Sequence, residues 1–111
     1  MKYFITLLVL GVLFIGCQKN KPAEETSTIA TKSIVCEMCV KTIKTALYKI
    51  DGVKDVEVDL EKKVTTVKFI PLQTNLETIE RAITEAGYDA NDRKRDPDAY
   101  SKLSECCKID G

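Results

Sequence analysis

Four of the five cysteines stand at spacings that suit metal binding or disulfide exchange. Cys36 and Cys39 are separated by two residues, and Cys106 and Cys107 are adjacent. Thiolates are soft donors, so a pair of them favours Cu(I), Hg(II) or Zn(II) over Mg²⁺ or Ca²⁺. The sequence contains no histidine, which excludes an imidazole base, a cysteine–histidine nucleophile pair and a histidine metal ligand. The chemistry must therefore come from carboxylates, amines, hydroxyls or these thiols.

The composition predicts one small domain without a nucleic-acid partner. The chain has 111 residues, and its 17 Lys and Arg residues balance its 17 Asp and Glu residues. A neutral balance provides no basic field for nucleic acid. The length leaves room for one domain once the two ends are set aside.

The residues around the first cysteine pair predict a strand, a loop and a helix. Residues 29–35 alternate weakly between apolar and polar, as a first strand does. From Cys39 onward, apolar residues recur at helical spacing, and Gly52 ends the helix. One sulfur would then lie in the loop and the other in the first helical turn, where the helix N-terminus lowers thiol pKa values. The apolar stripe of this helix consists of Val40, Ile43, Leu47 and Ile50.

The remaining pattern predicts a hairpin, a second helix and a short last strand. Residues 53–60 alternate strictly, residues 64–69 form a second β-rich run, and a charged turn separates them. Thr74 and Glu77 have the spacing of a capping box at the start of a helix. The order β-α-β-β-α-β predicts an α+β, ferredoxin-like fold, with both helices on one face of a four-stranded antiparallel sheet. The second helix has Leu76, Ile79, Ile83 and Ala86 as its stripe, Gly87 ends it, and residues 88–90 form the last strand.

Over residues 29–92 the chain resembles the heavy-metal-associated domain family, which includes copper chaperones, modules of metal ATPases and periplasmic mercury-binding proteins. The likeness rests on Cys36-x-x-Cys39, residues 50–53, the hairpin around 56–60 and the segment 86–88. The resemblance implies that Cys36 and Cys39 are the metal ligands. It also implies that Tyr88 stands near the site and that Ile34 replaces a buried loop methionine.

The two residues between the cysteines have alternative roles. Glu37 would raise the thiol pKa values and favour cations, or it is simply an acidic residue in the first helical turn. Met38 could offer a thioether to Cu(I), although a solvent-facing loop residue fits it better. Tyr88 could equally serve the site or pack behind the helix end.

The N-terminal residues predict export and lipid anchoring. Residues 1–16 combine a positive start with an apolar run of about 13 residues, too short to span a bilayer but suited to a signal peptide. The run ends in a sequence that resembles a bacterial lipobox, with Cys17 as the lipidated residue. Residues 17–28 are polar and predict a flexible linker. We therefore expect a domain held at the cell envelope, facing the periplasm or the exterior.

The tail, residues 93–111, predicts a short helix that carries the second cysteine pair back to the first. Asp96 and Pro97 suit a helix start, and Tyr100, Leu103 and Cys107 follow at helical spacing. An extended chain from residue 90 to 96 covers roughly 20 Å, and eight helical residues add about 12 Å. Cys106 and Cys107 could thus join a multi-thiolate site with Cys36 and Cys39, form a separate soft-metal site, form a disulfide with the first pair, or have no role.

The function expected from these features is a binding module and not an enzyme. It would capture, buffer or transfer one soft metal ion at the cell envelope, with Cu(I) favoured over Hg(II) or Zn(II), and a metal transporter or ATPase as partner. The alternatives are a thiol–disulfide oxidoreductase and a disulfide-bonded lipoprotein interaction domain. The oxidoreductase is disfavoured because no tryptophan adjoins the cysteines, no Gly-Pro lies between them, and the chain is too short for that fold.

Overall fold

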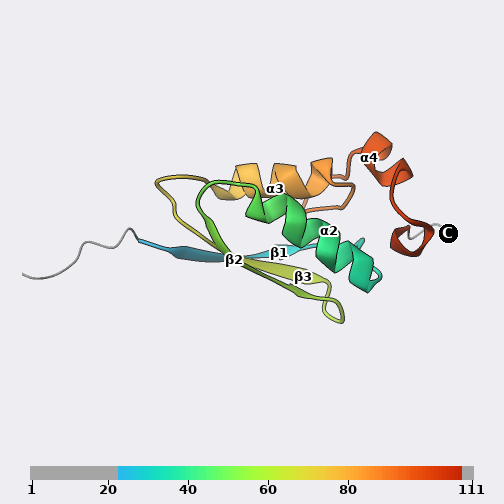
Figure 1. Cartoon of the computed structure of the whole chain (residues 1–111), viewed down its shortest axis with the longest axis horizontal. Helices are drawn as coiled ribbons and strands as arrows, with labels where there is room; N and C mark the ends of the chain where they lie inside the picture. Colours follow the sequence, from blue (N-terminus) through green and yellow to red (C-terminus); the bar gives the residue numbers. More distant parts are fainter. Residues whose placement is uncertain (1–22, 109–111) are drawn as a thin grey trace, which may run out of the picture.

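The computed structural model describes residues 23–108 of the chain (Figure 1). No helix within residues 23–108 is long and apolar enough to cross a membrane. The predicted signal peptide and Cys17 lie outside these residues. The elements are β1 (Glu25–Ala30), α2 (Glu37–Tyr48), β2 (Val53–Asp59), β3 (Val64–Phe69), α3 (Leu76–Glu85), α4 (Pro97–Ser101) and the 3₁₀ turn η1 (Glu105–Cys107).

The strands form an antiparallel sheet in the order β1-β3-β2, and α2 and α3 cover one face of it (Figure 1). The predicted hairpin is confirmed, with Lys63 in the left-handed conformation at its turn (φ 56°). Asp59 stabilises the turn because its carboxylate accepts a hydrogen bond from the Lys62 N–H at 3.0 Å.

The first strand lies earlier in the chain than expected. β1 begins at Glu25, so residues 25–28, which the composition assigned to the linker, belong to the sheet. Ile29 is the single buried residue of β1, because this edge strand leaves one face and one edge open. Residues 31–35, expected to continue the strand, form a turn in which the Ile34 N–H donates to the Thr31 carbonyl at 3.2 Å.

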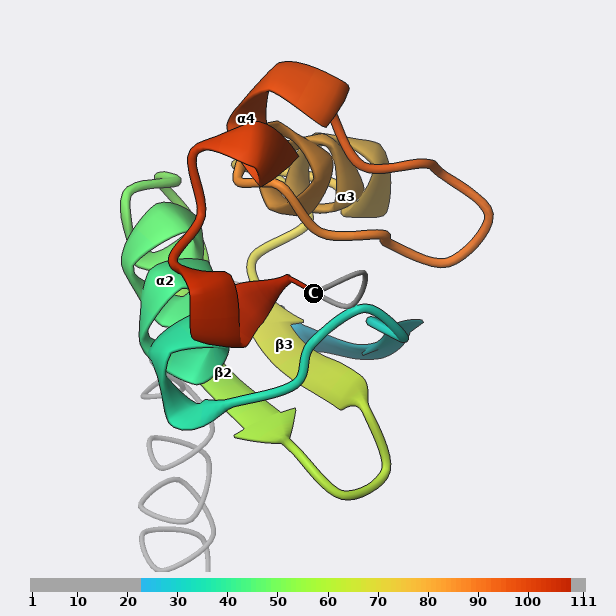
Figure 2. The ribbon, with the colours of Figure 1, turned by 90° about the vertical axis from the view of Figure 1, so that its right-hand side faces the viewer.

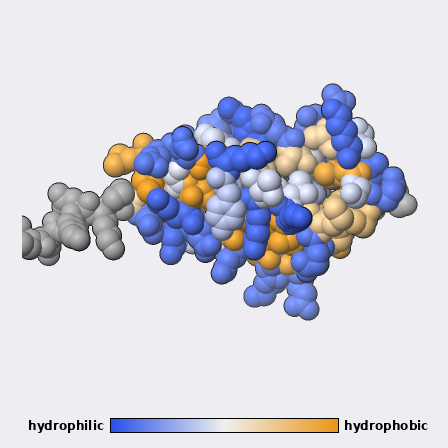
Figure 3. Space-filling model, in the orientation of Figure 1, coloured by the Kyte–Doolittle hydropathy of each residue, from blue (hydrophilic) through white to orange (hydrophobic). Residues whose placement is uncertain are grey.

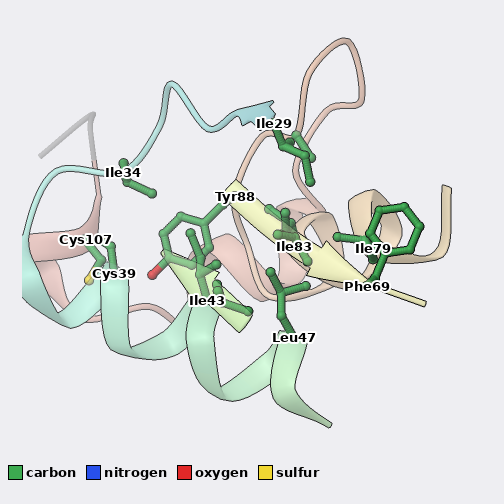
Figure 4. Close-up of a cluster of buried hydrophobic side chains, with 13 residues drawn as sticks. Ile29, Ile34, Cys39, Ile43, Leu47, Phe69, Ile79, Ile83, Tyr88 and Cys107 are labelled. Carbon is green, nitrogen blue, oxygen red and sulfur yellow. The ribbon is translucent and has the colours of Figure 1, made fainter. Parts of the chain in front are cut away.

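The hydrophobic core lies between the sheet and the two long helices (Figure 4). The helical stripe predicted from spacing is confirmed for Ile43 and Leu47, which have no exposed surface. Full burial of such a side chain contributes about 1.5–3 kcal/mol. Helix α2 ends near Lys49, and Gly52 then takes a φ of 101° that favours glycine. The other buried members include Val56, Val67 and Phe69 from the strands and Ile79 and Ile83 from α3.

The predicted capping box at the start of α3 is wrong by one residue. The side chain of Asn75 caps the helix by accepting a hydrogen bond from the Thr78 N–H at 2.8 Å. The Thr74 hydroxyl is instead buried, and it has no hydrogen-bond partner in the part of the chain that the structure describes. Both residue types favour caps, so spacing alone did not separate them.

The fourth strand is not formed in the described residues. After α3 the chain makes an isolated bridge between Ala90 and Arg93, and Asn91 adopts a left-handed conformation (φ 52°). Asn91 still closes the end of β1, since its N–H donates to the Ala30 carbonyl and its side chain accepts from the Ala30 N–H, both at 2.8 Å. The segment therefore touches the sheet edge at one residue pair instead of extending it.

The tail forms the predicted helix, but this helix is shorter than expected. The Asp96 side chain caps α4 by accepting from the Asp98 N–H at 3.2 Å, with Pro97 in the first turn. Helix α4 ends at Ser101, and the cysteine pair lies in the separate turn η1. Both segments lie at the end of the domain where α2 begins (Figures 1 and 2).

Candidate metal centre

Cys36 and Cys39 occupy the N-terminus of α2. Cys36 is the N-cap residue, and the Cys39 N–H donates to its carbonyl at 3.0 Å. The preceding loop is fixed beneath them because Ile34 is fully buried and the Thr31 hydroxyl contacts that of Thr65 at 3.1 Å. The Cys39 side chain has no exposed surface, whereas Cys36 is half-buried.

The second cysteine pair lies beside the first. Turn η1 packs against α2 (Figure 2), and the Cys107 N–H donates to the Ser104 carbonyl at 2.8 Å within it. Cys107 is almost fully buried, whereas Cys106 is exposed. The tail thus brings one protected sulfur and one accessible sulfur to the start of α2.

The sulfur of Cys36 is the centre of the group. It lies 3.5 Å from the Cys39 sulfur, 3.1 Å from that of Cys106 and 3.3 Å from that of Cys107. The Cys106 and Cys107 sulfurs are 3.9 Å apart. These distances exceed the bond of about 2.05 Å in a disulfide, and all four are free thiols.

The group formed by Cys36, Cys106 and Cys107 has dimensions suited to one metal ion, since its three sulfurs lie within 4.8 Å of one another. A triangle with the three observed sides has its centre about 2 Å from each corner, slightly less than a metal–thiolate bond of about 2.3 Å. An ion slightly out of the plane of the sulfurs could therefore contact all three.

The Cys36 thiol loses its proton more readily than an ordinary cysteine. Burial alone would raise its pKa, but hydrogen bonds with the thiols of Cys106 and Cys107 and with the Cys39 N–H lower that pKa to about 6. The pKa of Cys107 is raised, chiefly by burial and then by its contacts with Cys39 and Cys36. The pKa of Cys106 is raised chiefly by its hydrogen bond with Cys36. Cys36 is therefore mostly a thiolate at neutral pH.

Tyr88 lies directly behind the sulfurs. Its side chain is fully buried, and its hydroxyl points toward Cys39 and Cys107 (Figure 4). Burial raises the pKa of Tyr88, and its contacts with these two thiols raise it further. Within residues 23–108 the hydroxyl has no nitrogen or oxygen partner for a hydrogen bond. It therefore remains protonated and can offer its proton only to sulfur.

Comparison with known proteins places this arrangement in a family. The model of the heavy-metal-associated domain matches residues 28–89, more than half of the chain. The chain belongs to that family. The match covers α2, α3, β2, β3 and the last three residues of β1, but not the tail with Cys106 and Cys107.

Relatives of this heavy-metal-associated domain include proteins named for copper and for mercury. It is 34% identical over 79 residues to a probable copper-exporting P-type ATPase of Archaeoglobus fulgidus, where the match covers 71% of this chain but 10% of the ATPase. It is 33% identical over 69 residues to the mercuric transport protein periplasmic component of Shigella flexneri, covering 62% of this chain and 76% of that protein. The crystal structure of oxidized MerP from Ralstonia metallidurans CH34 matches with a TM-score of 0.60 and 30% identity, covering 62% of this chain and 96% of that one.

Met38 and Glu37, the two residues between Cys36 and Cys39, are exposed to solvent. Met38 is 52% exposed, so the structure favours the solvent-facing role expected for it. Glu37 is an exposed acidic residue in the first turn of α2. Hydrophobic residues gather at this end of the molecule (Figure 3), where Val35 and Met38 are exposed.

Two supports of this heavy-metal-associated domain were missed in the sequence. The Ser33 hydroxyl accepts a hydrogen bond from the Asp89 N–H at 2.9 Å and so joins the cysteine loop to the segment after α3. The sequence predicts that Gly87 ends α3. It does not predict that the tail packs directly against Gly87. A Cβ at Gly87 would stand 3.1 Å from Leu103 Cδ1 and 3.1 Å from the Tyr100 nitrogen. No local pattern reveals either contact, because both join segments distant in sequence.

Proposed function

We propose that this domain captures a soft metal ion through the thiolates of Cys36 and Cys39, with Cu(I) favoured and Hg(II) or Zn(II) as alternatives. The observation that carries the proposal is the 3.5 Å separation of these two sulfurs at a helix N-terminus in a heavy-metal-associated domain. Metal binding requires deprotonated thiols, and the lowered pKa of Cys36 supplies one thiolate at neutral pH.

The proposed setting is the cell envelope, with a lipid at Cys17 as the anchor. Two observations support it: the apolar run before Cys17, and a relative named as a periplasmic component of mercuric transport. The partner we propose is a membrane metal transporter or ATPase, because another relative is a P-type ATPase named for copper export.

Thiol–disulfide exchange is a second candidate, favoured by one observation. Cys36 has a lowered pKa and lies within 3.5 Å of three other thiols. Oxidation of Cys36 and a neighbouring thiol to a disulfide would release two protons and pass two electrons to a disulfide substrate. Metal capture remains the better proposal because the chain belongs to the heavy-metal-associated domain family and three of these sulfurs lie within 4.8 Å of one another, close enough to share one ion.

Metal capture is tested by native mass spectrometry of the reduced chain with Cu(I), Zn(II) or Hg(II) and excess competing glutathione. The expected result is one retained ion per chain, lost when Cys36→Ser and Cys39→Ser are combined. A matched control is Ser104→Ala, which changes an exposed side chain near the site but no sulfur. Absence of a retained ion, together with reduction of a model disulfide by the same protein, would favour thiol exchange instead.

A further inference from the structure

We propose that the tail is a strap that closes the metal site, with Cys106 and Cys107 joining Cys36 as ligands in a three-thiolate cage. The strap is defined as residues 97–108, which comprise α4 and η1. This proposal rests on the proposed function and extends it from an open thiolate pair to an enclosed ion. The family match ends at residue 89, before the strap, so these two sulfurs lie outside the matched part of the chain.

The strap is docked at its start by contacts that involve no cysteine. The Asp96 N–H donates to the Thr84 carbonyl at 3.0 Å and fixes the tail to the end of α3. Helix α4 then crosses Gly87 so closely that a Cβ there would stand 3.2 Å from the Ala99 carbonyl carbon. Leu103 packs against the hydrophobic core beyond this crossing. These contacts deliver the following residues to α2 whether or not an ion is present.

Cys36 belongs to two possible ligand pairs at once. Its sulfur lies 3.5 Å from Cys39 in α2, and 3.1 and 3.3 Å from the two sulfurs of the strap. An ion first held by Cys36 and Cys39 can therefore gain strap ligands while Cys36 remains bound. The group within 4.8 Å that could hold an ion includes Cys36 and both strap cysteines but not Cys39. The closed site is thus centred on the strap.

The two strap sulfurs differ in burial, and we therefore expect them to have different roles in metal binding. Cys106 is exposed and can meet an incoming ion, whereas Cys107 is almost fully buried beside Tyr88 and shields the bound ion from behind. Each added thiolate releases a proton and leaves fewer directions from which a competing thiol can attack. The cage therefore favours ions that accept three thiolates and slows their release, which suits sequestration.

The test measures Cu(I) affinity by competition with a chromophoric chelator and counts sulfur ligands by X-ray absorption, using the full reduced chain. We expect three sulfur ligands in the natural chain. Combined Cys106→Ser and Cys107→Ser should reduce the count to two and weaken binding tenfold or more, which is about 1.4 kcal/mol. Leu103→Asp keeps every cysteine but removes a docking contact of the strap, and we expect the same direction of change.

A matched control is Lys102→Ser, an exposed neighbour of Leu103, which should leave affinity and ligand count unchanged. Circular dichroism of each variant verifies that α2 and α3 remain folded. Unchanged affinity and two sulfur ligands in both the natural chain and the strap variants would overturn the cage but leave the proposed function intact. Failure of the natural chain to bind Cu(I) at all would overturn both.

Discussion

The sulfur atoms of Cys36 and Cys106 lie 3.1 Å apart although the two residues are 70 positions apart in the sequence. Helices α2, α3 and α4 and strands β2 and β3 lie between these residues, so a ligand shared by them connects the start of α2 to the tail. An ion that binds the folded chain and not the unfolded chain stabilises it by mass action.

Metal binding should therefore raise the thermal stability of the reduced chain. At a free Cu(I) concentration 100 times the Kd, the free energy of unfolding should increase by about 2.7 kcal/mol. Calorimetry with and without the ion measures this change, and a chelator should reverse it. Combined Cys36→Ser and Cys39→Ser serves as the control, and an equal increase in that variant would contradict binding at these sulfurs.

The lowered pKa of Cys36 should be visible in the pH dependence of its alkylation. The pKa falls from the ordinary 9.0 to about 6, so Cys36 should react with iodoacetamide at neutral pH and lose reactivity as the pH falls through 6. Mass spectrometry of the modified peptide gives the profile. Combined Cys106→Ala and Cys107→Ala removes two hydrogen bonds to the thiolate and should move the midpoint toward 9.0. An unmoved midpoint would show that the tail does not stabilise the thiolate.

The same shift makes stability depend on pH. Because the folded state lowers the pKa of Cys36, its contribution is fully present above pH 9 and is lost as the pH falls through about 6. The free energy of unfolding of the metal-free, reduced chain should thus rise between pH 6 and 9 more steeply than in Cys36→Ser. The raised pKa values of Cys106 and Cys107 oppose this trend only as the pH nears 9, where these two thiols begin to ionise in the unfolded chain. Equal slopes in urea titrations of the two chains would refute the prediction.

Two substitutions at Tyr88 separate the contribution of its ring to stability from that of its hydroxyl. Tyr88→Ala should cost about 3–5 kcal/mol, since it removes a fully buried aromatic ring. Tyr88→Phe should change the free energy of unfolding by less than about 1.5 kcal/mol, because the hydroxyl has no nitrogen or oxygen partner to lose. Chemical denaturation of both variants checks the two values. A cost for Phe that approaches the cost for Ala would mean that the contact with sulfur dominates.

The start of α3 provides a second matched pair. Asn75→Ala removes the capping hydrogen bond to the Thr78 N–H and should cost about 1 kcal/mol. Thr74→Val removes a buried hydroxyl that has no partner and should be neutral or stabilising. Denaturant midpoints of the two variants show whether Asn75 or Thr74 caps the helix. A larger loss of stability in Thr74→Val than in Asn75→Ala would mean that Thr74 is the capping residue.

The sequence revealed those parts of the fold in which local pattern and tertiary burial agree. Strict alternation in β2 and the stripe around Ile43 and Leu47 required no distant information. β1 was placed too late because an edge strand buries little: its Glu25–Thr28 portion is polar and looks like a linker. The expected fourth strand is not formed in the described residues, because Asn91 turns the backbone at the edge of β1.

The proximity of the two cysteine pairs was expected from chain length and topology, but the manner of docking was not. Reach is a property of the sequence, since it depends on residue count and element order. The close crossing of α4 over Gly87 and the Ser33–Asp89 hydrogen bond depend on how distant segments meet in three dimensions. They could not be read from any local window.

Strand β1 enters the fold at Glu25, at the end of the domain opposite to the start of α2 and η1 (Figure 1). If the chain is attached to a membrane ahead of this strand, the sulfurs face outward, away from the lipid. An ion arriving from outside then meets Cys106 directly. Delivery to a transporter in the same membrane would require the whole domain to turn over. With such an attachment, the direction in which the strand enters would ease collection of an ion from outside and would make return delivery to the membrane depend on rotation of the domain.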